Sequence, residues 1–128
     1  MSRGPPPKSA IDAVLPVAWA RGYVTICTRE RGSVCNLIIH AETYTGVVQV
    51  VRTRKLHGSI DDTIWQHREH LARLRLIPAG LCRSLELWAC SQYGGIRFFR
   101  LTATGMIELT RAGDPKSTGD GKGGKTGV

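Results

Sequence analysis

Four valines around one glutamine constrain this chain more than any other feature of its sequence. Val47, Val48, Val50 and Val51 flank Gln49 in one uninterrupted stretch. β-Branched residues at this density favour a strand that is buried on both faces of a sheet. An amide side chain in such a strand is unfavourable unless it finds hydrogen-bond partners. The stretch therefore predicts a central strand in which Gln49 is either bonded internally or directed into a functional cleft.

The pattern of apolar residues on either side of this strand predicts one α/β domain. Helices are expected over residues 8–21 and 61–75, and strands over 23–30, 34–42, 47–55, 81–91 and 96–102. Their α-β-β-β-α-β-β order predicts a single mixed β-sheet flanked by helices. The domain is expected to span residues 8–110, between a flexible arm at 1–7 and a disordered Gly/Lys-rich tail at 111–128.

Local signals set the expected ends of these elements. Ser9 and Ser59 are each followed three residues later by an aspartate, which predicts a capping box at both helix starts. Gly22 is expected to end the first helix in a left-handed conformation. Thr45 and Gly46 are expected to form the turn that leads into the central strand.

Aromatic residues are assigned mainly to the core. Trp19 and Trp65 fall within the predicted apolar faces of the two helices. Phe98 is expected in the core of the sheet, while Tyr93 is open to either a core or a base-stacking role.

The charge of the chain bears on its partners. Lysine and arginine number 18 against 10 acidic residues, which gives a net charge of +8. Such a surplus favours a polyanionic partner, nucleic acid first and anionic lipid second. No apolar run of about 18 residues is present, so no membrane partner is expected, and the protein is expected in the cytoplasm. In that compartment its four cysteines are expected to be reduced and buried. Their spacing does not support a zinc site.

Residues 119–126 match the phosphate-binding pattern Gly-x-x-x-x-Gly-Lys-Thr. That loop functions between a strand and a helix whose amide groups hold the phosphates. A Gly-rich tail precedes the match and two residues follow it, so the sequence predicts no nucleotide site here.

Basic residues near the end of the central strand form the candidate nucleic-acid site. Arg52 and Arg54 project to the same face in β geometry, next to Lys55. Phosphate contacts from such residues give affinity that depends on salt. The full set expected to bind nucleic acid is Arg52, Arg54, Lys55, Arg68, Arg73, Arg97 and Arg100.

Short strand motifs carry a resemblance to a known family. The Asn36-Leu-Ile-Ile and Gln49-Val-Val-Arg-Thr-Arg strands, in this order of elements, look like the PD-(D/E)XK nuclease superfamily. The nearest shapes are the archaeal Holliday-junction resolvases and the Mrr-type restriction enzymes. The later Glu86-Leu-Trp-Ala and Gly95-Ile-Arg-Phe-Phe-Arg segments also fit small members. The similarity covers residues 8–105 in layout and implies a restriction-endonuclease-like fold.

The resemblance also implies where a catalytic site would be. In that family an aspartate, a glutamate and a lysine two residues after the glutamate bind a divalent metal and position water. These groups fall on Asn36, Gln49 and Val51 of this chain, and glutamine at the second position resembles the Mrr-type variant. Asn36 lacks the charge that Mg²⁺ prefers in its ligands, and Val51 has no ammonium group. The resemblance therefore implies a degenerate catalytic motif, with Asn36 and Gln49 hydrogen-bonded to each other.

The sequence as a whole predicts a nuclease-like protein that binds nucleic acid, DNA in particular, without cleaving it and without a cofactor. One alternative is a Mg²⁺-dependent endodeoxyribonuclease in which Glu42, Asp12 or Glu30 supplies a displaced carboxylate. A second alternative is a protein-interaction domain or subunit that binds an acidic partner. The choice between DNA and RNA, between duplex and branched substrates, and between a monomer and a homodimer is left open.

Overall fold

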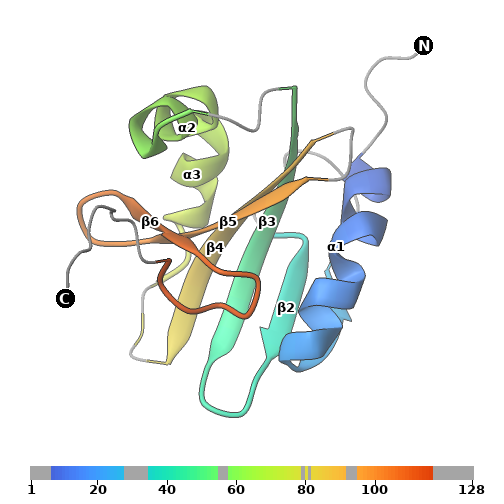
Figure 1. Ribbon diagram of the computed structural model, residues 1–128. Coiled ribbons are helices and arrows are strands. Elements are labelled where there is room, and N and C mark those ends of the chain that lie inside the picture. The colour runs from blue at the N-terminus through green and yellow to red at the C-terminus, as the bar shows by residue number, and fades with distance from the viewer. Residues whose placement is uncertain are drawn as a thin grey trace, which may run out of the picture.

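The computed structural model describes residues 7–27, 35–54, 58–78, 80, 82–91 and 95–116. Within these residues a six-stranded mixed sheet lies between α1 on one face and α2 and α3 on the other (Figure 1). The elements in chain order are α1 (Pro7–Arg21), β1 (Tyr23–Ile26), β2 (Leu37–His40), β3 (Thr45–Thr53), α2 (Ile60–Gln66), α3 (Arg68–Leu74), β4 (Arg83–Ser91), β5 (Ile96–Leu101) and β6 (Met106–Leu109).

The strands lie in the sheet in the same order as in the chain. Neighbouring strands pair antiparallel, except that β3 and β4 are parallel. A parallel pair needs a crossover connection, and α2 and α3 supply it between β3 and β4. The predicted α/β class with one mixed sheet is therefore confirmed.

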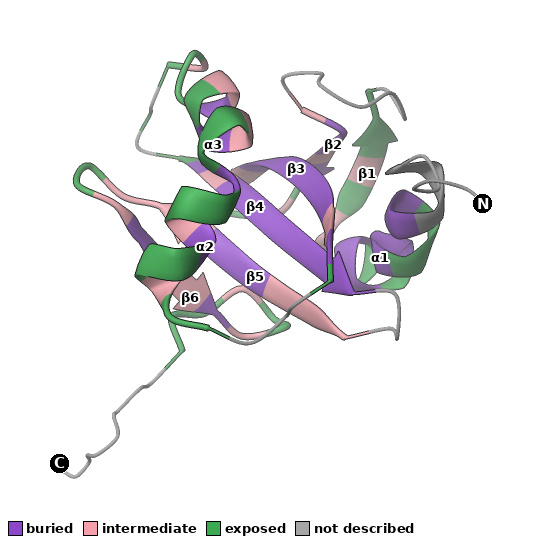
Figure 2. Ribbon diagram, turned by 90° about the horizontal axis from the view of Figure 1, so that it is seen from above, coloured by how far each residue is buried: buried purple, intermediate pink, exposed green. Residues whose placement is uncertain are grey.

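The valine-rich strand lies at the centre of the sheet and is buried on both faces (Figure 2). Val48 and Val50 pack in the cluster that α1 covers. Val47 and Val51 pack in a second cluster, beneath α3. Because successive side chains of a strand alternate between its faces, this one strand contributes to both cores.

The crossover contains two short helices where the sequence predicts one helix over residues 61–75. The chain leaves helical geometry at His67, with φ −112° and ψ 26°, and α3 begins at the next residue. The capping box at Ser59 is confirmed, because its hydroxyl accepts a hydrogen bond from the Asp62 amide at 3.0 Å. The prediction of a capping box at Ser9 is wrong, because α1 begins at Pro7 and Ser9 therefore lies inside the helix.

Two tryptophans lie outside the core, contrary to the prediction. Trp19 and Trp65 are both exposed, while Ile11, Val14 and Leu74 are buried on the helix faces that meet the sheet. A helix turns about 100° per residue, so Trp65 and the neighbouring apolar position cannot both face the sheet. Phe98 is buried in the α1 cluster as expected, and Tyr93 lies outside the described residues.

The connections also differ in detail from the prediction. Thr45 and Gly46 belong to β3, and the turn before them closes with a hydrogen bond from the Ala41 amide to the Tyr44 carbonyl. Gly22 does follow α1, but its φ is not positive; a Cβ there would lie 2.5 Å from the His40 carbonyl oxygen. Close approach of β2, rather than a left-handed conformation, therefore accounts for glycine at this position.

The end of the domain holds a strand that the sequence analysis missed. β6 pairs with β5 and buries Met106 and Leu109. Residues 111–116, which the sequence assigns to the tail, continue this edge, with Lys116 donating its amide hydrogen to the Glu108 carbonyl. The phosphate-binding pattern at 119–126 lies outside the described residues.

Candidate nucleic-acid interface

The three degenerate catalytic positions lie together in the middle of the sheet and are closed to solvent. Asn36 and Gln49 are each 1% exposed and Val51 is 5% exposed. The register that pairs Leu37 with Val48 places Asn36 opposite Gln49. The three positions thus lie close together on neighbouring parts of the sheet, and none of them faces solvent.

Asn36 completes the backbone hydrogen bonding of β3. Its backbone N–H donates to the Val48 carbonyl at 2.8 Å, and its side-chain Oδ1 accepts from the Val50 backbone N–H at 2.8 Å. Asn36 immediately precedes β2, and its side chain supplies the acceptor that a longer β2 would otherwise provide to β3. A buried amide hydrogen without a partner is unfavourable by about 1–3 kcal/mol, so this bond explains an asparagine here without any catalytic role.

Gln49 does not complete the expected pair with Asn36. Its Oε1 is buried and has no hydrogen-bond partner among the described residues. The side chain lies on the face of β3 that carries Val47 and Val51, beneath α2 and α3. An unsatisfied buried amide oxygen of this kind destabilises a fold unless it serves another purpose.

Carboxylates that could replace the missing ones lie elsewhere. Asp12 is exposed on α1, on the opposite face of the sheet, and Glu42 is exposed in the turn between β2 and β3. That turn is six residues from Asn36, or roughly 20 Å along an extended chain. Glu30 lies outside the described residues. Among the described residues no three His, Cys, Asp or Glu side chains gather as metal ligands would.

The other face of the sheet contains a buried ion pair that the sequence did not reveal. Arg21, at the end of α1, donates from Nη1 to Glu86 Oε1 on β4 at 2.9 Å, and their side chains are only 3% and 2% exposed. Glu86 also accepts hydrogen bonds from Ser84 Oγ and Trp88 Nε1, both at 2.8 Å. The guanidinium lies 4.8 Å from the centre of the Trp88 ring. This network joins α1 to the sheet and is inaccessible to a large ligand.

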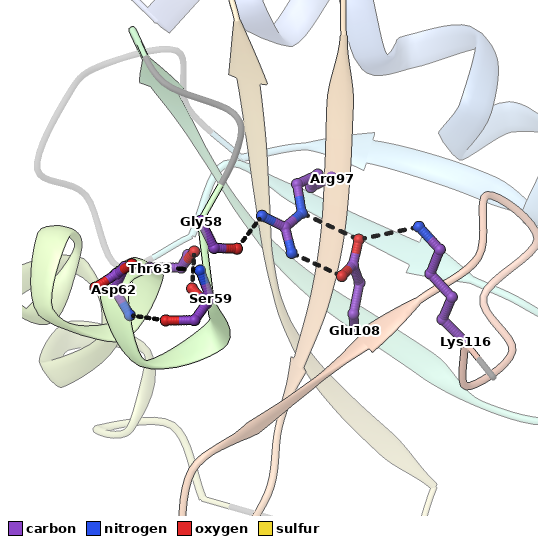
Figure 3. A network of polar contacts seen from close by, with 7 residues as sticks. All are labelled: Gly58, Ser59, Asp62, Thr63, Arg97, Glu108 and Lys116. Carbon is purple, nitrogen blue, oxygen red and sulfur yellow. Dashed lines mark hydrogen bonds and ion pairs between the residues drawn. The ribbon is translucent and has the colours of Figure 1, made fainter. Parts of the chain in front are cut away.

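Arg97 is already engaged within the protein. Figure 3 shows its guanidinium between Glu108, which it contacts at 2.7 and 3.1 Å, and the Gly58 carbonyl at 3.0 Å. Hydrogen bonds from Arg97 lower the pKa of Glu108 below its ordinary value of 4.5. Lys116 contacts the same carboxylate at 3.3 Å. A phosphate could reach Arg97 only in competition with this ion pair.

Four of the predicted arginines have no such partner. They make no hydrogen bond or ion pair with other described residues, and Lys55 lies outside that part of the chain. The four are Arg52, Arg54, Arg73 and Arg100. Arg73 lies near the far end of α3, and Arg100 is opposite Glu86 on the α1 face. Arg52 and Arg54 lie at the carboxyl end of β3, where Arg52 shares the α1 face with Val48 and Val50, while Arg73 and Arg100 lie on other elements.

The α2–α3 junction, which contacts the end of β3, carries an exposed aromatic residue. Gln66, the last residue of α2, donates to Thr53 Oγ1 at the end of β3 at 2.8 Å. This bond holds the α2–α3 junction against the end of the strand, and Trp65 is the residue just before Gln66. Trp65 is 67% exposed, and the Arg68 guanidinium lies over its ring at 4.0 Å.

These residues surround the carboxyl end of β3, with Arg52 on the α1 face of the sheet and Thr53 on the face that the α2–α3 junction contacts. In open α/β sheets, ligands commonly bind outside the carboxyl ends of the parallel strands. Here the end of β3 carries Arg52 and Arg54, which make no hydrogen bond or ion pair within the described part of the chain, and the crossover adds a stacked Trp–Arg pair. We call this region at the end of the strand the carboxyl edge; it consists of Arg52, Thr53, Arg54, Trp65, Gln66 and Arg68.

Part of the positive charge lies outside the described surface. Seven of the 18 lysines and arginines have side chains that the structure does not describe: Arg3, Lys8, Arg29, Arg31, Lys55, Lys122 and Lys125. The carboxyl edge thus holds only a part of the net charge of +8.

The histidines of the crossover have a structural rather than a catalytic environment. His67 is buried at the α2–α3 junction, 6.0 Å from His70 between ring centres. Burial, reinforced by His70, lowers the pKa of His67 to about 4. Burial likewise lowers the pKa of His70. His67 is therefore neutral at physiological pH and adds no charge to the carboxyl edge.

No helix among the described residues is long and apolar enough to cross a membrane. The chain matches no protein-family model, and comparison with curated proteins finds no similar sequence.

Proposed function

We propose that the protein binds single-stranded nucleic acid, DNA in particular, through the carboxyl edge and does not cleave it. The observation that carries this proposal is Trp65, a large aromatic side chain that is exposed to solvent and has the Arg68 guanidinium over its ring. Exposed aromatic rings flanked by cations bind the unpaired bases of single strands by stacking, while the cations contact phosphate. Within a duplex the base faces are already stacked and closed to such a ring.

The layout of the chain supports a nuclease-like origin of this scaffold. Three antiparallel strands follow a helix, and a helical crossover leads to a strand parallel to the third, in the order of elements that the resemblance requires. The absence of cleavage is supported by the motif positions, which hold two neutral amides and a valine, all buried. Mg²⁺ needs charged oxygen ligands and access to water and substrate.

The test is oligonucleotide binding measured by fluorescence anisotropy. Wild-type protein is titrated into labelled single-stranded DNA, single-stranded RNA and duplex DNA of the same sequence. We expect the single strands to bind more tightly than the duplex. Affinity for them should fall steeply as salt rises, because each neutralised phosphate contributes about −0.7 to the slope of log K against log salt.

Two variants locate the interface, and the chain offers a matched control. Trp65→Ala should weaken single-strand binding about 5- to 150-fold, which corresponds to the loss of about 1–3 kcal/mol of stacking. Trp19→Ala removes the other exposed helix tryptophan and should leave the affinity unchanged. Arg54→Ala should lower the salt slope by about 0.7. Equal effects of Trp65→Ala and Trp19→Ala would refute the carboxyl edge as the site.

The two rival functions predict other results. A protein-interaction domain would bind none of the oligonucleotides at low salt. A metal-dependent endonuclease would nick DNA in Mg²⁺ or Mn²⁺ and lose this activity in Glu42→Ala or Asp12→Ala. We expect no nicking by the wild type. Rebuilding the motif as Asn36→Asp, Gln49→Glu and Val51→Lys would bury three charges, so we expect that variant to unfold rather than to cut.

A further inference from the structure

Two thiols meet where β1 and β2 come together. Cys27 directly follows β1 and Cys35 lies two residues before β2, and their Sγ atoms are 3.5 Å apart. The Cys27 amide donates to the Asn36 carbonyl at 2.8 Å, so backbone pairing holds the two cysteines side by side. A disulfide has an S–S length of about 2.05 Å, which a closing movement of about 1.5 Å would reach.

The two thiols have different environments. Cys27 is exposed to solvent, whereas Cys35 is partly buried and donates its S–H to Cys27 Sγ. Burial and this hydrogen bond raise the pKa of Cys35 to about 12. A dissolved oxidant therefore reaches Cys27 first, and Cys35 stays protonated at contact distance from it.

We propose that Cys27 and Cys35 are a redox-sensitive pair that a peroxide converts to an intramolecular disulfide. The Cys27 thiolate attacks one oxygen of the peroxide; an S–O bond forms, the O–O bond breaks and the departing hydroxide is protonated to water. Cys35 sulfur then attacks the Cys27 sulfenic acid; the S–S bond forms, the S–O bond breaks, and the Cys35 proton leaves with the hydroxide as a second water. Two thiols are oxidised and one hydrogen peroxide is reduced to two waters. A dithiol reductant reverses the reaction by exchange.

Closure would strengthen the fold close to Asn36. The bond would join the residue after β1 to the residue before Asn36, whose side chain supports the Val50 amide. A disulfide that closes a nine-residue loop stabilises mainly by limiting the unfolded chain. We expect the melting temperature to rise by about 5–10 °C on oxidation and to fall again on reduction.

The other two cysteines provide the control. Cys90 is buried and donates to the Ser91 carbonyl, and Cys82 is exposed beside β4. In Cys82→Ser/Cys90→Ser the proposed pair is intact, so this double variant should oxidise as the wild type does. Cys35→Ser should instead stop at the Cys27 sulfenic acid, which dimedone traps.

The experiment treats the reduced full-length chain with hydrogen peroxide, quenches with acid and alkylates the remaining thiols. We expect the pair to escape alkylation. Before alkylation, the intact mass of the peroxide-treated chain should be about 2 Da below that of the reduced chain. Trypsin cuts after Arg29 and Arg31, so non-reducing digestion should give a linked pair of peptides, one with Cys27 and one with Cys35. Any of three products would overturn the proposal: Cys27 sulfinic acid with Cys35 still free, a bond from Cys27 to Cys82, or a covalent dimer through Cys27.

Discussion

Replacing Glu86 by leucine tests the buried ion pair that connects α1 to the sheet. The carboxylate accepts hydrogen bonds from Arg21, Ser84 and Trp88, and leucine can accept none of them. The Arg21 guanidinium would then be buried beside aromatic rings with no negative charge. The serine hydroxyl can rotate to another acceptor, but the Trp88 N–H cannot.

The expected loss of stability follows from these contacts. Breaking a buried ion pair by removing one partner is destabilising by about 3–5 kcal/mol. An unsatisfied indole N–H adds about 1–3 kcal/mol. Glu86→Leu should therefore lower the free energy of unfolding by at least about 4 kcal/mol, a large part of the 5–15 kcal/mol typical of a domain. Glu86→Gln keeps an acceptor oxygen for Trp88 and should have a smaller effect.

A double-mutant cycle separates the pair from its surroundings. Arg21→Met removes the buried cation, and its Nη2, which has no partner among the described residues, goes with it. The double variant Arg21→Met/Glu86→Leu should be at least about 2 kcal/mol more stable than the sum of the single losses predicts. Urea unfolding followed by circular dichroism gives the four free energies. Additive losses, or a change below about 1 kcal/mol for Glu86→Leu, would show that the pair is not buried as described.

Two further predictions concern the α2–α3 side of the sheet. Gln49→Met removes the unpartnered Oε1 and should raise the free energy of unfolding by up to about 2 kcal/mol, measured in urea; a loss above about 1 kcal/mol would contradict an unsatisfied oxygen. Stability should fall by about 3 kcal/mol as pH drops from 6.5 to 4, because unfolded His67 takes up a proton in this window and folded His67 does not. His67→Leu should flatten this dependence in urea unfolding at the two pH values, whereas an unchanged slope would assign it to other groups.

The fold was predictable where local pattern and tertiary packing agree. The valine run predicted a doubly buried central strand, and Ser59 with Asp62 predicted the start of the crossover helix. The break at His67 was not predictable from periodicity, because both short helices keep an apolar face toward the sheet. Trp65 was assigned to that face together with Ile64, although adjacent helix positions point in directions about 100° apart.

The candidate site was predictable only in part. The sequence places Arg52 and Arg54 at the end of the central strand, where the structure leaves them at least partly exposed; their role in binding stays a prediction. The stacking of Arg68 on Trp65 follows from helix spacing once Trp65 is recognised as exposed. The engagement of Arg97 by Glu108 depends on the pairing of β5 with β6, a strand that the sequence analysis missed. The Arg21–Glu86 pair joins residues 65 positions apart and leaves no local signal.

The different lengths of β2 and β3 explain why neutral side chains occupy the motif positions. β3 continues past the end of β2, so the Val50 amide would have no acceptor unless Asn36 supplied its Oδ1. Aspartate could accept the same bond, but it would bring a charge into a site closed by α2 and α3, and glutamate at Gln49 would add a second. Helices packed over this face are thus compatible with amides and incompatible with paired carboxylates. Beyond Val51 the chain reaches solvent at Arg52 and Arg54, and under the function we propose these cations contact phosphate rather than take part in hydrolysis.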